Sequence, residues 1–184
     1  MTAPIKRFIA TPEGSETTHF HILFENFGAA VYYAQLFEGT LRLLVSGRQM
    51  AGLMEADPSK LPRDPKGIID LCIGPMIKLL ESKSRVEIPK DFYTRLKEAN
   101  EIRNYLIHTF LIEHSDEFIS EPGQIAVTDR LFRLYATIRK THAMLVPLVD
   151  KVLEILGVTP EDTQKRLNEL RSYGNRFPDA TLDA

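Results

Sequence analysis

Three polar residues of one predicted helix could act together on a phosphate group: Arg103, Asn104 and His108. Asn104 and His108 are four residues apart, so their side chains share a helical face, and the long side chain of Arg103 can reach the same surface. A guanidinium group binds phosphate oxygens in pairs, imidazole moves a proton near neutral pH, and an amide can orient either one. These three residues are therefore the candidate catalytic residues.

The helix that carries them is predicted over residues 90–115 and is apolar around much of its circumference. At about 100° per residue, the following side chains fall within about 60° of Arg103: Phe92, Leu96, Ala99, Leu106, Ile107 and Phe110. An arginine inside an apolar stripe destabilises the fold unless it is paired or reaches a polar pocket. Because Ile112 and Tyr105 lie on the far side, we expect the helix to be covered twice, by its own core and by a neighbouring helix or second subunit.

Arg103 and His108 also have a purely structural interpretation. His108 could be held at a helix–helix contact by an ordinary hydrogen bond. Arg103 could pair with Glu98 or Glu101 of its own helix, or with a carboxylate of a neighbouring helix. The structural and functional interpretations of Arg103 are compatible, because an arginine that locks an interface can still face a phosphate group.

The bulk composition limits the remaining classes of function. A chain of 184 residues with 43% hydrophobic content can bury one core, and a net charge of −2 excludes the broad basic field of a protein that coats nucleic acid. The single cysteine, Cys72, cannot form an internal disulfide or a zinc cage, which suits a reducing compartment. The most apolar stretch, residues 20–37, is interrupted by polar and charged residues. We therefore expect a cytoplasmic protein with no membrane segment.

Apolar periodicity predicts an all-α fold, an up-and-down helical bundle of four main helices plus a short C-terminal helix. The expected organisation is a flexible N-terminal arm over residues 1–16, the bundle over 17–156, a C-terminal helix over 157–174 and a tail over 175–184. The first main helix should start near residue 17 and end at Gly47, followed by a loop over residues 48–64.

The other helix boundaries follow from proline, glycine and capping residues. The second helix should start at Asp64 and run to about residue 83, with a kink or interruption at Gly74 and Pro75. The fourth should run over residues 128–156, with a bend at Pro147. Thr159 and the residues after it predict the start of the C-terminal helix, which should end near Gly174.

The third helix resembles the signature helix of the HEPN superfamily. The matching string is Arg103-Asn104-Tyr105-Leu106-Ile107-His108, in which four residues separate the arginine from the histidine and a polar residue follows the arginine. The resemblance covers about residues 17–156 and implies a helical bundle that forms a homodimer, with the two signature helices facing each other across a composite cleft. It also implies a metal-independent ribonuclease without a cofactor, often a toxin with an antitoxin protein partner or a phage-defence component.

Relatives of this kind that have lost catalysis bind nucleotides, RNA or proteins, so the resemblance leaves two functions open. The first is an endoribonuclease with RNA as its substrate, in which His108 is the general acid or base, Arg103 stabilises the phosphoryl charge and Asn104 orients the phosphate or the imidazole. The second is a non-catalytic HEPN-like module. A helical adaptor, with Arg103 and His108 as interface polar groups, is a third interpretation.

The remaining residues with reactive side chains favour structural roles. The histidines His19, His21, His114 and His142 lack metal-ligand spacing, so we expect no metal site. The basic cluster of Arg130, Arg133, Arg139 and Lys140 could steer RNA, but a charge run on an amphipathic helix is usually a solvated face. Cys72 lies between Leu71 and Ile73, which favours packing over nucleophilic chemistry.

Overall fold

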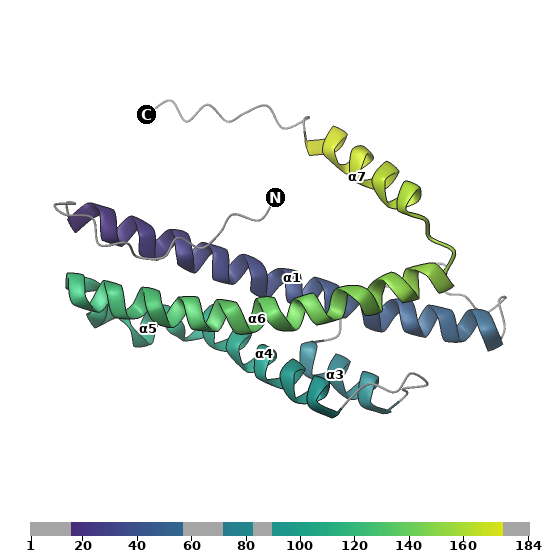
Figure 1. Cartoon of the computed structure of the whole chain (residues 1–184), viewed down its shortest axis with the longest axis horizontal. Coiled ribbons are helices and arrows are strands. Elements are labelled where there is room, and N and C mark those ends of the chain that lie inside the picture. The colour runs from purple at the N-terminus through teal and green to yellow at the C-terminus, as the bar shows by residue number, and fades with distance from the viewer. Residues whose placement is uncertain (1–15, 57–71, 83–89, 175–184) are drawn as a thin grey trace.

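The computed structural model describes residues 16–56, 72–82 and 90–174, and every secondary structure element in these ranges is helical (Figure 1). The elements are α1 (Glu16–Ala56), α3 (Ile73–Ser82), α4 (Lys90–His108), α5 (Phe110–Glu113), the 3₁₀ helix η2 (Ser115–Ile119), α6 (Glu121–Ile155) and α7 (Pro160–Gly174). The prediction of an all-α bundle is confirmed. All of the predicted arm except its last residue, and the tail over 175–184, lie outside the described residues.

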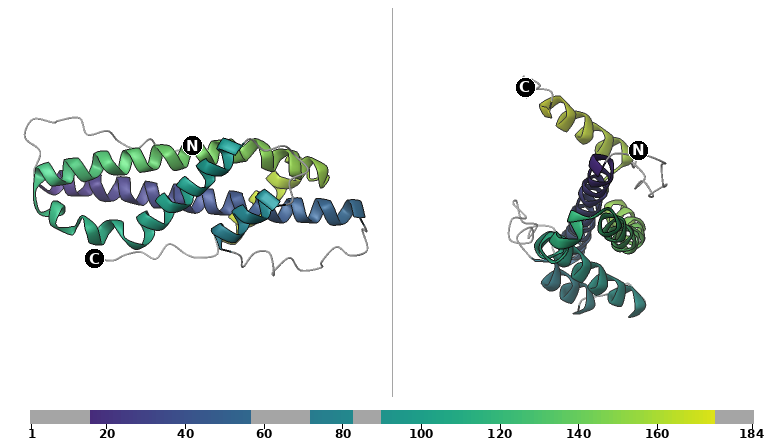
Figure 2. Two further views of the ribbon diagram at one scale, coloured as in Figure 1. Left: turned by 90° about the horizontal axis from the view of Figure 1, so that it is seen from below. Right: turned by 90° about the vertical axis from the view of Figure 1, so that its left-hand side faces the viewer.

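The two longest helices, α1 and α6, lie side by side and run in the same direction (Figure 2). Three contacts that advance together along both helices set their register: Tyr33 with Tyr135, Thr40 with His142, and Gly47 with Val152. The α1 partners are seven residues apart, which is about two helical turns, so the same face of α1 meets α6 along this whole length. This pairing forms the frame of the bundle.

Helix α4 packs against this frame in the opposite direction. Phe27 of α1 stacks on Phe110 at 5.9 Å between ring centroids, while Glu38, further along α1, contacts Arg103, which comes earlier in the chain than Phe110. The short helix α3 holds the start of α4, because the Tyr93 hydroxyl donates to the Leu80 carbonyl at 3.1 Å. The largest fully buried side chains come from all four of these helices and include Phe37, Leu41, Met76, Ile77, Leu96, Leu106, Leu131, Ile138 and Leu145.

The predicted end of the first helix at Gly47 is wrong, because α1 continues to Ala56. Gly47 lies inside the helix and is buried against α6. A Cβ atom at this position would come within 2.5 Å of Val152 Cγ1. The glycine is therefore explained by the close approach of the two helices, and residues 48–56 are helical where a loop was expected.

The third helix is shorter than predicted. It ends at His108, because Thr109 leaves the helical conformation with φ −127° and ψ −35°, and the chain continues through α5 and η2. The residues after the signature helix therefore form a compact turn, where the sequence pattern predicted a continuous helix to residue 115. This turn places His108 at a helix terminus.

The start of the fourth main helix also differs from the sequence pattern, which placed it at residue 128. The α6 helix begins at Glu121 because Ser120 caps it, its hydroxyl accepting from the Gly123 amide at 3.3 Å, so Pro122 sits in the first turn. Pro147 lies inside α6. Gly74 and Pro75 lie in the first turn of α3, and the start predicted at Asp64 falls outside the described residues.

The C-terminal helix is confirmed as α7, which extends away from the other helices (Figures 1 and 2). Thr159 and Asp162 cap its start reciprocally. The Asp162 amide donates to the Thr159 hydroxyl at 3.1 Å, and the Thr159 amide donates to the Asp162 carboxylate at 3.0 Å. The hydrogen bonds that the Asp162 carboxylate accepts from the amide and the hydroxyl of Thr159 lower the pKa of the Asp162 carboxyl group.

The contact at Gly47 gives a test of the α1–α6 packing. We expect Gly47→Ala to destabilise the protein by about 1–3 kcal/mol, because the added methyl group collides with the buried Val152 side chain. Gly28→Ala is the matched control, since a Cβ there meets nothing within 4 Å and alanine favours the helix by about 0.5–1 kcal/mol. Urea unfolding measures both, and equal shifts in the two variants would rule out the close approach.

Candidate functional site

Arg103 is held by a carboxylate of the neighbouring helix α1. Its Nη2 donates to Glu38 Oε2 at 2.7 Å, and both side chains are only 22% exposed. Glu98 and Glu101, the partners considered within α4, are exposed. The apolar stripe therefore accommodates its arginine because the adjacent helix provides a counter-charge, as a partly buried guanidinium requires.

Asn104 is the second partner of this arginine. Arg103 Nη1 donates to Asn104 Oδ1 at 2.9 Å, which orients an amide side chain that is otherwise on the surface. The remaining amide NH₂ of Asn104 is a hydrogen-bond donor. The structure thus brings two of the three candidate residues into direct contact.

His108 is exposed and lies on the last turn of α4, beside Asn104 in helical spacing. Its ring has no hydrogen-bond partner among the side chains that the structure describes, so the ordinary helix–helix hydrogen bond considered above is not formed with any of them. Within a single chain, the imidazole is exposed to solvent and makes no hydrogen bond to Arg103 or Asn104.

Glu38 also binds a second arginine, Arg42, which lies one turn along α1. Arg42 Nη2 donates to Glu38 Oε1 at 2.9 Å, so each carboxylate oxygen carries one guanidinium group. Sequence reasoning missed both residues. The signal was present, since Glu38 and Arg42 are the only charged residues between Asn26 and Ser46.

A second polar cluster lies next to the C-terminal end of α4. It is centred on His114, which is only 8% exposed. Its Nδ1 contacts Glu117 Oε1 at 2.6 Å and its Nε2 contacts the Tyr105 hydroxyl at 2.7 Å. Arg130 Nη1, from α6, lies against the same ring and donates to Glu117 at 3.2 Å. The His114 ring is therefore in contact with Tyr105, Glu117 and Arg130 at once.

Two pKa values in this cluster are shifted. The hydrogen bonds from His114 and Arg130 lower the pKa of the Glu117 carboxyl group, and burial, with Glu113 nearby, raises the pKa of the Tyr105 hydroxyl group. Both ring nitrogens of His114 are occupied, so this histidine is a structural link between α4, the η2 turn and α6. The sequence did not predict this linking role, because the apolar pattern placed His114 inside a continuous helix.

The other reactive side chains have varied surroundings. His142 is partly buried, and its Nε2 lies 3.0 Å from the Thr40 hydroxyl; burial lowers the pKa of its ring. Cys72 is exposed, which corrects the expectation that it packs. In the predicted basic cluster, Arg130 is bound to Glu117, whereas Arg133, Arg139 and Lys140 are exposed.

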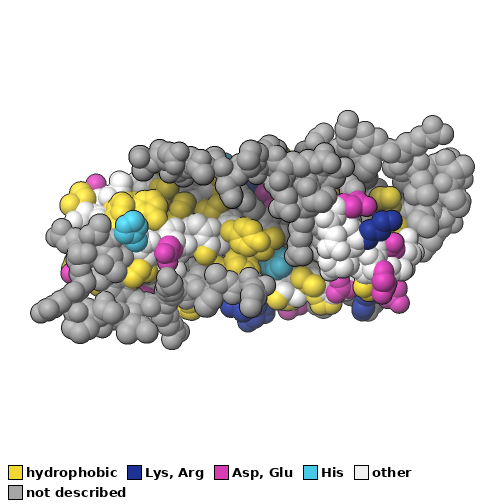
Figure 3. All heavy atoms as spheres, turned by 90° about the horizontal axis from the view of Figure 1, so that it is seen from above, with side chains coloured by type: hydrophobic (Ala, Val, Ile, Leu, Met, Phe, Trp, Pro, Cys, Tyr) yellow, Lys and Arg dark blue, Asp and Glu magenta, His cyan; other side chains and the backbone are white. Residues whose placement is uncertain are grey.

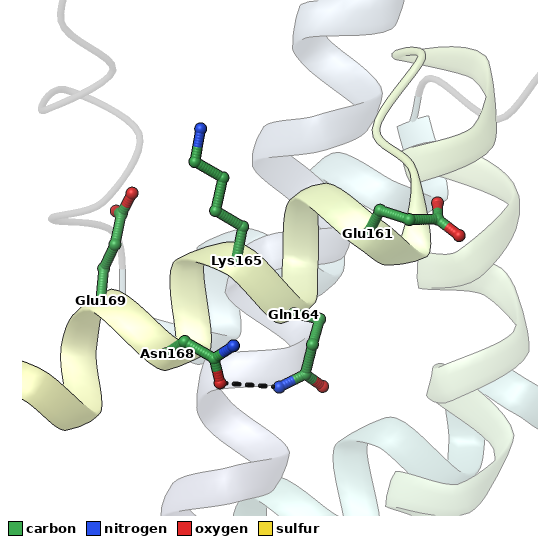
Figure 4. A pocket seen from close by; sticks show the side chains of 5 residues that line it. All are labelled: Glu161, Gln164, Lys165, Asn168 and Glu169. Atoms are coloured by element: carbon green, nitrogen blue, oxygen red, sulfur yellow. Dashed lines mark hydrogen bonds between the residues drawn. The ribbon is translucent and has the colours of Figure 1, made fainter.

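Two further observations on the described residues concern other places where a ligand could bind. An open hollow lies on α7, lined by Glu161, Gln164, Lys165, Asn168 and Glu169, with Gln164 donating to Asn168 at 3.0 Å (Figure 4). All of its lining residues belong to α7, so it is not part of the Arg103 site. Within residues 16–56, 72–82 and 90–174, no three potential metal ligands are grouped and no helix is long and apolar enough to span a membrane.

Comparison with known proteins finds no family model, no curated protein and no solved structure that matches this chain. The site is therefore interpreted from its own geometry: a half-buried guanidinium fixed by two partners, an exposed amide and an exposed imidazole on one helix.

The two histidines near the end of α4 should differ sharply in their contribution to stability. His114→Ala should cost about 1–3 kcal/mol, because Tyr105, Glu117 and Arg130 lose a buried partner. His108→Ala should change the free energy of unfolding by no more than about 0.5 kcal/mol, since the side chain is exposed. Urea unfolding at pH 7 makes the comparison; a His108 variant as unstable as the His114 variant would contradict the assignment.

The lowered pKa of His142 predicts a pH-dependent stability. In the unfolded chain the ring titrates near about 6.5, so between that pH and the lower folded pKa the unfolded state binds more protons. The contribution of His142 should be complete above about pH 6.5 and decline as the pH falls toward the folded pKa. Unfolding measured from about pH 7.5 to 5 should show a shallower decline for His142→Gln than for wild type; identical slopes would refute it.

Proposed function

We propose that this protein is a metal-independent endoribonuclease of HEPN type, with an active site completed by a second copy of the chain. The observation that carries the proposal is the arrangement on α4. Arg103 is fixed by Glu38 and Asn104 while Asn104 and His108 remain exposed on adjacent turns of the same helix. A positioned guanidinium beside an accessible imidazole suits phosphate-ester cleavage.

Exposed apolar side chains around His108 support the homodimer. Ile107 is 36% exposed, and in the turn that follows Ile112 and Ile119 are 76% and 84% exposed. On α1, Phe24 is 40% exposed and its ring lies 6.3 Å from that of Phe118 in the same turn. Hydrophobic side chains also gather in patches on the face seen in Figure 3, which is the side of the bundle turned away from α4. Burying such side chains against a second copy would stabilise a symmetric dimer and turn an open surface into a cleft.

In the proposed reaction, the ribose 2′-hydroxyl group of RNA attacks the adjacent phosphate. The 2′ oxygen–phosphorus bond forms, the bond from phosphorus to the 5′ oxygen breaks, and a 2′,3′-cyclic phosphate remains. His108 takes the proton from the 2′-hydroxyl, and the imidazolium of the other copy's equivalent histidine gives a proton to the leaving oxygen. Arg103 stabilises the charge on the phosphoryl oxygens, and the Asn104 amide orients the phosphate.

The cellular setting follows from this activity. An unrestricted ribonuclease harms its own cell, so we place the protein in the cytoplasm as a toxin or phage-defence component, with an antitoxin protein as a candidate partner. The net charge of −2 fits an enzyme that contacts RNA through one local site.

A second candidate function is a non-catalytic HEPN-like module that binds nucleotide, RNA or a protein. The observation that favours it is the ion pair itself, because Glu38 and Asn104 already occupy two N–H groups of Arg103 within one chain. In that case the arginine serves mainly to join α4 to α1, and His108 is a surface contact.

Cleavage of a labelled RNA in the presence of EDTA tests the first function. We expect His108→Ala and Arg103→Ala to reduce the cleavage rate by about 10²–10⁴-fold, the usual worth of a general acid–base group or of a charge-stabilising donor. His21→Ala is the matched control, since it removes an exposed histidine of α1 and should leave the rate unchanged.

Three outcomes would count against the enzyme. Equal cleavage by the His108 and His21 variants would exclude His108 as the catalytic group, and loss of cleavage with EDTA would exclude the metal-independent reaction. Wild-type protein that binds RNA but never cleaves it would favour the non-catalytic module.

A further inference from the structure

Arg42 lies in a position that neither the sequence motif nor the proposed chemistry accounts for. It belongs to α1, yet its guanidinium group shares the carboxylate of Glu38 with Arg103 of α4, with N–O distances of 2.9 and 2.7 Å. The three side chains are between 22% and 26% exposed, so the group is partly shielded but open to a ligand.

The charges in this group do not cancel. Two guanidinium groups share one carboxylate, so one net positive charge remains at the surface where Asn104 is exposed. Such a charge at a partly desolvated position attracts an anion more strongly than a fully hydrated surface charge does.

The two arginines also have hydrogen-bond donors to spare. Each guanidinium carries five N–H groups; Arg42 uses one on Glu38, and Arg103 uses one on Glu38 and one on Asn104. Arg103 Nε is buried and has no hydrogen-bond partner among the described residues. Glu38 binds one guanidinium group on each oxygen of its carboxylate, so the two arginines are held as neighbours on either side of one small group.

We propose that Arg42 and Arg103 together bind one phosphate group of RNA, and that Glu38 is the positioning residue that holds them for it. The inference rests on the proposed function for its ligand, since the phosphate is that of the RNA backbone. It adds to that function a binding residue on α1, outside the signature helix. Arg42 contacts the phosphate, whereas Glu38 acts only through the two arginines.

The alternative is an ordinary ion pair between residues four apart on one helix, worth about 0.3–0.5 kcal/mol of stability and unrelated to any ligand. Arg95 offers a control of that kind. Its Nε lies 3.8 Å from Asp91 Oδ2, also four residues away, and this buried nitrogen has no hydrogen-bond partner among the described residues. Arg95 is eight residues before Arg103, about 12 Å along α4.

Binding of a fluorescein-labelled 2′-O-methyl RNA oligonucleotide tests the phosphate site without requiring cleavage, because this probe lacks the attacking hydroxyl group. The dissociation constant is measured over a range of KCl concentrations for wild type, Arg42→Gln, Arg42→Lys and Arg95→Gln. We expect Arg42→Gln to bind about tenfold more weakly and to lower the slope of log K against log salt by about 0.7, the value for one phosphate contact on a single strand.

The other two variants separate charge from geometry. Arg42→Lys should keep the salt slope and lose part of the affinity, because lysine retains the charge and lacks the planar fork. Arg95→Gln should change the dissociation constant less than twofold. If Arg42→Gln matches Arg95→Gln in affinity and salt slope, or if wild type binds no oligonucleotide at any salt concentration, the phosphate site is excluded.

Glu38→Gln tests the positioning role in a cleavage assay. With the carboxylate removed, oligonucleotide binding should be at least as tight as in wild type, while kcat falls about tenfold or more because Arg103 is no longer held. A kcat equal to that of wild type would exclude the positioning role. Wild type that binds through Arg42 but does not cleave RNA would leave the phosphate site standing and remove the ribonuclease, so the two proposals fail separately.

Discussion

The ion pair between Arg103 and Glu38 is the constraint on which the rest of the site depends. A guanidinium group placed in the apolar stripe of a helix destabilises the fold unless a partner compensates for its lost hydration. Helix α1 provides that partner because it runs antiparallel to α4 and brings Glu38 opposite Arg103 at 2.7 Å. Once the pair has formed, the second nitrogen of the guanidinium orients Asn104. One contact thus meets a requirement of folding and also positions the two side chains of the phosphate site that we propose.

The surrounding fold keeps this contact in place from two sides. Contacts spaced about two turns apart fix α1 against α6, so Glu38 and Arg42 stay at the edge of the frame. At the other end, His114 links Tyr105 of α4 to the turn before α6, and so limits the movement of the helix end that carries His108. The catalytic face that we propose therefore rests on packed elements, as a preorganised site requires.

The sequence allowed the fold class and the placement of Arg103 in an apolar stripe to be predicted, because helical periodicity depends only on spacing. Phe92, Leu96, Ala99, Leu106 and Phe110 of that stripe are buried, whereas Ile107 is partly exposed. The partner of Arg103 could not be predicted, since Glu38 is 65 residues away and the local carboxylates were equally plausible. The His114 cluster depends on a turn that periodicity cannot place, and Gly47 was misassigned because glycine suits both a helix end and a close helix contact.

In the homodimer that we propose, the face carrying Arg103, Asn104 and His108 meets its copy in a second chain. The most direct measurement is thiol cross-linking with a short bismaleimide in a Cys72→Ser background, which removes the exposed native cysteine. We expect Ile107→Cys to give a covalent dimer at micromolar protein concentration. Ile155, the last residue of α6, is 59% exposed, and Ile155→Cys should give no covalent dimer. Monomer in both variants, or cross-linking through residue 155 alone, would contradict it.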